Sequence, residues 1–187
     1  MKRLTTLLAI AIISSNIASS KNIVLADPAI LCEGDTYYLS GTYSSDGFLL
    51  YTSTDLVHWT QSENLALTKG QSFGTGSFWA PQFFKHNGKY YMAYAANEEI
   101  AIACSENTEG PYTQNTIAQI PSSTKQIDPF VFFDTDGKKY LYHVRLTNGN
   151  RIFVAEINDD FQSIKEETLK ECFGASDGTW EDSQNST

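Results

Sequence analysis

The sequence predicts an all-β protein built as a β-propeller, and three observations support this fold class. A pattern of proline, apolar strand, glycine turn and tyrosine occurs three times, with a period of about 50 residues. The apolar runs are short and rich in Tyr, Phe, Val and Ile, and no stretch combines helical periodicity with capping residues. Four short strands in a repeat of this length are typical of one propeller blade. A β-sandwich with coincidental spacing is the alternative.

Each repeat begins at a proline, and an aromatic residue opens its last segment. The prolines, which are 53 and 48 residues apart, are Pro28, Pro81 and Pro129. The aromatic residues, which are 53 and 49 residues apart, are Trp59, Tyr112 and Phe161. Two independent sets of positions therefore give the same period.

These repeats predict one propeller domain at residues 21–187. Its blades are expected at about 24–70, 78–121 and 125–170, with the start of a fourth blade at the C-terminal end. Propellers close with at least four blades. The sequence therefore indicates part of a propeller, or a ring that is completed in some other way.

The first 20 residues have the pattern of a secretory signal peptide. Lys2 and Arg3 supply positive charge, Leu4–Ile13 form an apolar run, and small residues lead to a cleavage site near Ser20. The apolar run is shorter than the roughly 20 residues that a membrane-spanning helix needs. We therefore expect a secreted or periplasmic protein that has no contact with the membrane after cleavage.

Composition argues against several classes of partner and cofactor. The formal net charge of −9 makes nucleic acid a poor partner. Three cysteines without a CxxC pair or a histidine cluster give no zinc signal. Asp134 and Asp136 resemble the start of a calcium loop, but the downstream glutamate is missing and a hairpin turn is the better interpretation. We expect no cofactor, and a structural calcium ion has no support in this chain.

The repeat predicts where polar side chains meet. The start of the first strand and the end of the second strand of a blade lie at the same face of the ring. Asp27, the pair Trp79-Ala80 and Asp128 occupy equivalent places before the three prolines, so we expect them around one axial mouth. The ends of the second strands add further candidates for binding a substrate, namely Asn97, His143 and Arg145.

Two carboxylates and an indole at one mouth suit glycoside hydrolysis, in which paired carboxyl groups flank the bond and an aromatic ring stacks on the sugar. An Asp-Pro pair that merely begins a strand is the alternative. The equivalent register of Asp27 and Asp128 in two repeats favours the functional interpretation.

Four motifs together resemble glycoside hydrolase family 43 over residues 22–163. They are Asp27-Pro28, the run Ser53-Thr54-Asp55-Leu56 with Trp59, Phe78-Trp79-Ala80-Pro81 with Gly88-Lys89-Tyr90-Tyr91, and Ile127-Asp128-Pro129. The resemblance implies a five-bladed propeller, of which about three blades are present. It also implies inverting hydrolysis of plant glycans that contain arabinose or xylose. Related sucrose- and fructan-active families usually begin with Asn-Asp-Pro-Asn, which Ala26-Asp27-Pro28-Ala29 does not match.

The resemblance also implies a role for each matching residue. Asp27 would be the general base that activates water, and Asp128 would be the carboxylate that orients the catalytic acid and raises its pKa. Trp79 would form part of the sugar pocket. The family's acid is a glutamate, usually in a Glu-Gly-Pro context, and we expect it beyond Thr187. Neither Glu109, at the rim of the ring, nor Glu181, in an unrelated context, fits that role.

The sequence thus predicts the N-terminal part of a family 43-like glycosidase whose partner is a carbohydrate substrate. A non-catalytic carbohydrate-binding or degenerate propeller is an alternative, as is a truncated chain that cannot close its ring.

Overall fold

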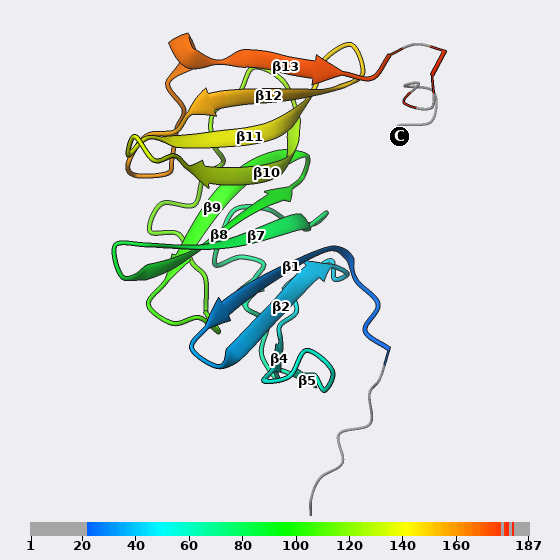
Figure 1. Ribbon diagram of the computed structural model, residues 1–187, viewed down its shortest axis with the longest axis vertical. Coiled ribbons are helices and arrows are strands. Elements are labelled where there is room, and N and C mark those ends of the chain that lie inside the picture. The colour runs from blue at the N-terminus through cyan, green and yellow to red at the C-terminus, as the bar shows by residue number, and fades with distance from the viewer. Residues whose placement is uncertain (1–21, 177, 180, 182–187) are drawn as a thin grey trace, which may run out of the picture.

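The computed structural model describes residues 22–176, 178, 179 and 181, so the predicted signal peptide lies outside the described residues. The described residues form three larger antiparallel sheets, which are stacked one against the next (Figure 1). Each sheet is one blade, and its strands follow one another in chain order across the sheet. Within the same residues, no helix is long and apolar enough to cross a membrane.

The first blade has its strands in the order β1-β2-β4-β5. These strands are β1 (Ala26–Glu33), β2 (Thr36–Thr42), β4 (Tyr51–Ser53) and β5 (Thr60–Gln61). A small separate sheet pairs β3 (Gly47–Phe48) with β6 (Leu67–Thr68). Glycine is required at position 47, because a Cβ there would lie 1.9 Å from the carbonyl oxygen of Leu67.

The second and third blades follow the same plan. The second consists of β7 (Trp79–His86), β8 (Lys89–Ala96) and β9 (Glu99–Ser105). The third consists of β10 (Gln126–Phe133), β11 (Lys139–Leu146), β12 (Asn150–Glu156) and β13 (Lys170–Gly174), with the short 3₁₀ helix η1 (Glu166–Thr168) before β13.

The second blade departs from the expected four strands. Its fourth segment is reduced to an isolated bridge between Cys104 and Thr113. Pro111 has no N–H to donate, and the N–H of Tyr112 bonds to the carbonyl of Ala66 instead, at 2.8 Å. The backbone donors that a fourth strand would need are therefore missing or already used.

The first strand of each blade contains the same irregularity. In β1, β7 and β10 the pairing register shifts across the residue that precedes the proline and the proline itself. The residue before each proline has a positive φ, which is 48° at Asp27, 43° at Ala80 and 54° at Asp128. A left-handed conformation costs a residue with a side chain roughly 1–2 kcal/mol. Bulges of this kind re-aim side chains and are frequent beside functional sites.

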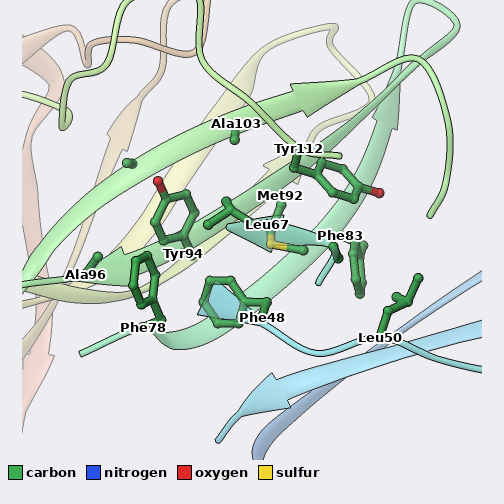
Figure 2. Close-up of a cluster of buried hydrophobic side chains, with 12 residues drawn as sticks. Phe48, Leu50, Leu67, Phe78, Phe83, Met92, Tyr94, Ala96, Ala103 and Tyr112 are labelled. Atoms are coloured by element: carbon green, nitrogen blue, oxygen red, sulfur yellow. The ribbon is translucent and has the colours of Figure 1, made fainter. Parts of the chain in front are cut away.

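Two hydrophobic clusters hold the blades together. The first, between the first and second blades, contains the rings of Phe48, Phe78 and Tyr94, whose centroids lie 5.6 to 6.2 Å apart (Figure 2). The second cluster, between the second and third blades, includes Ala93 and Phe84. Because Tyr94 and Ala93 are neighbours on β8 and enter different clusters, the second blade is buried on both faces.

The remaining faces of the outer blades carry exposed apolar side chains. On the first blade, Ile30 is 54% exposed. On the third blade, Phe132 is 42% exposed and Phe173 is 66% exposed. Large exposed apolar side chains that share one face mark a surface that packs against another element.

Candidate active site

One pocket of about 580 Å³ opens where the first strands of the three blades begin. Its walls come from the same short stretch of each strand. They are Asp27, Pro28, Ala29 and Ile30 of β1, Ala80, Pro81, Gln82 and Phe83 of β7, and Asp128, Pro129 and Phe130 of β10. The three bulges therefore bring the residues before the prolines to one place, as the repeat predicted.

The pocket holds two carboxyl groups from segments about 100 residues apart in the chain. Partial burial, and to a smaller extent the negative charge of Asp27, raise the pKa of the Asp128 carboxyl above its usual range. The charge of Asp27 therefore acts on the carboxyl group of Asp128 across the pocket. Ala80, at the equivalent position of the second blade, presents only a methyl group.

The carboxylate of Asp27 is held by a threonine of the same blade. The hydroxyl of Thr42, the last residue of β2, donates to Oδ2 of Asp27 at 2.8 Å. The same hydroxyl oxygen accepts a hydrogen bond from the backbone N–H of Ala80 at 2.9 Å. One side chain thus connects the carboxylate of the first blade with the main chain of the second.

Trp79, the first residue of β7, is half-buried. It lines a smaller neighbouring hollow of about 220 Å³ together with Thr42, Tyr43 and Phe78. Trp79 is not among the residues that line the two-carboxylate pocket, although the next residue, Ala80, is. Its predicted role in sugar binding stays a prediction.

The other three predicted ligands lie away from the walls of the pocket. His143 is only 1% exposed, and burial lowers its pKa to about 4. The guanidinium of Arg145 donates to the hydroxyls of Ser122 and Thr124, at 2.8 and 3.0 Å. The Asn97 side chain accepts from the backbone N–H of Thr75 at 2.7 Å. None of the three lines the pocket that holds the two aspartates, and their role as substrate ligands stays a prediction.

Two motifs singled out in the sequence have local structural roles. Oδ1 of Asp55 accepts backbone hydrogen bonds from Val57 and His58, and Oδ2 lies 2.7 Å from the His58 ring. The contact with that ring, and then the backbone donors, hold the pKa of Asp55 far below its usual range. In the loop before β11, Asp136 accepts a hydrogen bond from the N–H of Lys138, as expected for a turn.

Gln82 and Thr42 were missed by the sequence analysis and can be recognised only when the three repeats are aligned with one another. Gln82 directly follows its proline, and the equivalent positions of the other blades hold Ala29 and Phe130. Thr42 is paired across the sheet with Ala26, just before the bulge, where the other blades have Ala95 and Val144. A polar residue in a position that is otherwise apolar is the signal in both cases.

Comparison with known proteins shows to which family this chain belongs. The family model for glycosyl hydrolases family 43 matches residues 21–185. The chain belongs to this family. The resemblance seen in the sequence is thereby confirmed.

Family 43 relatives share both sequence and fold with the chain. The extracellular exo-α-(1→5)-L-arabinofuranosidase ArbA of Cellvibrio japonicus is 28% identical, over 81% of this chain and 49% of its own length. The extracellular endo-α-(1→5)-L-arabinanase of Thermotoga petrophila is 29% identical, over 64% of this chain and 33% of its own length. The crystal structure of an endo-1,4-β-xylanase from Bacteroides thetaiotaomicron superimposes with a TM-score of 0.77 and 41% identity, over 81% of this chain and 53% of that chain.

The chain thus spans about half the length, or less, of these family 43 relatives. The structural neighbours are five-bladed propellers, so the blades described above are part of a propeller. The prediction of an all-β propeller that is only partly present is confirmed.

Proposed function

We propose that the full-length protein is an inverting glycoside hydrolase that acts on plant glycans containing arabinose or xylose. The observation that carries this proposal is the pair of aspartates, Asp27 and Asp128, at equivalent bulges in one pocket. Membership of family 43 supports the reaction class. The names of the relatives, which include an arabinofuranosidase, an arabinanase and a xylanase, support the substrate class.

In this proposal Asp27 is the general base. Its carboxylate accepts a proton from a water molecule as that water attacks the anomeric carbon. The leaving oxygen takes a proton from a glutamate that belongs to the part of the protein beyond residue 187. Because attack and departure occur on opposite faces of the sugar, the product has the inverted anomeric configuration.

Asp128 acts on the catalytic acid rather than on the sugar bond. A general acid must keep its proton near neutral pH, and a nearby negative charge raises its pKa. We propose that Asp128 supplies this charge when it is ionised and also orients the acid. We also propose that Trp79, which lines the smaller hollow together with Thr42, provides an apolar wall for the sugar ring.

The proposed site of action is outside the cytoplasm, in the medium or the periplasm. The signal-peptide pattern of residues 1–20 supports this, as does the word extracellular in the names of two relatives. A glycan too large to enter the cell would be met there.

The decisive experiment compares Asp27→Asn with the unaltered full-length protein on arabino- and xylo-oligosaccharides. We expect hydrolysis to fall about 10²- to 10⁴-fold, the usual contribution of a general base, while calorimetry still detects binding of the sugar. Proton NMR of the first product formed by the unaltered protein should show the inverted anomer. The matched control is Asp35→Asn, which makes the same change at the other end of the β1–β2 hairpin.

Near-normal turnover by Asp27→Asn would reject the assignment of Asp27 as base. Sugar binding by the full-length protein without any turnover would instead favour a carbohydrate-binding propeller.

A further inference from the structure

The link between Thr42 and Asp27 has a direction that its chemistry fixes. A hydroxyl group has one proton to donate and lone pairs that accept. One lone pair of the Thr42 oxygen receives the N–H of Ala80, at 2.9 Å. The proton of the hydroxyl is therefore directed to the remaining partner, Oδ2 of Asp27, at 2.8 Å.

This arrangement suits a carboxylate that acts as a base. A hydrogen-bond donor favours the ionised form of the group that it contacts. With Oδ2 engaged by Thr42, Oδ1 of Asp27 is left to receive a proton. The threonine thus fixes the orientation of the carboxylate.

The bulge in the second blade supplies the anchor for the threonine. The β7–β8 pairing connects Trp79 with Ala95 and Gln82 with Ala93, and Ala80 has no partner in this register. Its N–H is released from the ladder and bonds across to the first blade. The orientation of the Asp27 carboxylate consequently depends, through Thr42, on the main chain of the neighbouring blade.

We propose that Thr42 is a positioning residue that holds the Asp27 carboxylate ready for base catalysis and ties it to the second blade. This inference rests on the proposed function of Asp27. The fold itself does not demand a hydroxyl at this place, because the equivalent residues of the other blades are Ala95 and Val144. Valine at position 42 would reproduce what the third blade already contains.

The test is made on the full-length protein with Thr42→Val, Thr42→Ser and Thr42→Ala. Thr42→Val is expected to lower kcat about 10- to 100-fold, as misplacement of a catalytic group does, with KM changed less than about twofold. Thr42→Ser keeps the hydroxyl and should recover most of kcat. The matched control is Thr52→Val on β4 of the same blade, away from the pocket, which should behave like the unaltered protein.

Thr42→Ser and Thr42→Ala form a second pair that differs only in the hydroxyl. Should Thr42→Val fail to fold, a kcat ratio of at least about 10 between these two variants supports the proposal, and a ratio near 1 overturns it. A normal kcat in a folded Thr42→Val overturns it as well. Asp27→Asn distinguishes failure of the Thr42 proposal from failure of the proposed function. If that variant is inactive while Thr42→Val has a normal kcat, only the role of Thr42 is wrong. If Asp27→Asn is active, the proposed function itself is wrong.

Discussion

The imidazole of His143 lies on β11 opposite the bulge that contains Asp128, and only 1% of the residue is exposed. Among the described residues, its Nε2 has no hydrogen-bond partner. Burial, and to a smaller extent the positive charge of Arg145, lower its pKa from 6.5 to about 4. Between these values the unfolded chain binds a proton that the folded protein does not. Stability should therefore fall as the pH drops from 6.5 to 4, by roughly 3 kcal/mol at most.

His143→Leu removes this proton uptake, so we expect a flatter profile of unfolding free energy across the same window. Urea unfolding of the full-length protein at several pH values measures it. His86→Leu, at a half-buried histidine at the end of β7, controls for the loss of a histidine as such. A profile for His143→Leu as steep as that of the unaltered protein would contradict the prediction.

For single residues, the repeat predicts which side chains meet at the site, whereas residue type alone does not. Asp27 and Asp128 could be predicted to meet because each stands before the proline of a repeat. Strand direction alone predicts Arg145 and His143 near the mouth. The structure shows that the hydroxyls of Ser122 and Thr124 engage Arg145 and that packing encloses His143. The face to which each side chain turns depends on the register, which the sequence pattern did not resolve.

Among the elements, β7 and β10 are joined by one side chain of the second blade. Oε1 of Gln82 accepts from the N–H of Val131 at 2.6 Å, and Nε2 donates to the carbonyl of Val131 at 3.1 Å. The side-chain amide thus pairs with the first strand of the third blade as another strand would. Gln82→Met keeps the length of the side chain and leaves both backbone groups without this partner. We expect a loss of about 2 kcal/mol in unfolding free energy, measured by urea denaturation.

Gln61→Met on the exposed strand β5 is the matched control and should change stability by less than about 0.5 kcal/mol. Gln82→Glu keeps the oxygen that accepts from Val131 but not the donor, so an intermediate loss is expected. Equal stability of Gln82→Met and Gln61→Met would show that this amide does not join the blades.

The strands themselves were largely predictable, because short alternating runs between turns need little tertiary information. The fourth strand of the second blade was not. Pro111 has no backbone N–H, and the N–H of Tyr112 donates to the carbonyl of Ala66 in a loop distant in the sequence. The apolar run 48–53 is divided between two sheets, since Phe48 pairs with Leu67 and only Tyr51–Ser53 continue the first blade.

For the molecule as a whole, the repeat gives a blade and its spacing but not the number of blades in the ring. Closure of the ring depends on how neighbouring sheets pack, and the sequence of a single repeat says little about that packing. The five-bladed ring follows from the family 43 neighbours, of which this chain covers 53% in the xylanase and 61% in a Bacillus subtilis arabinanase. The exposed aromatic residues of the third blade point to the same incompleteness.

Phe132 on β10 provides a test at this scale. It is 42% exposed on the outward face of the third blade, next to Tyr142, whose ring centroid is 6.4 Å away. If another blade covers this face in the full-length protein, Phe132→Ser removes a large buried side chain there. We expect a loss of about 2–4 kcal/mol in unfolding free energy, by analogy with large-to-small core substitutions.

Ile117→Ser is the control, because Ile117 is 54% exposed in a loop of the second blade, whose two faces are already covered. That variant should change stability by less than about 0.5 kcal/mol. Equal, small effects of both substitutions would mean that the face of Phe132 stays open to solvent and that the ring is not completed on this side.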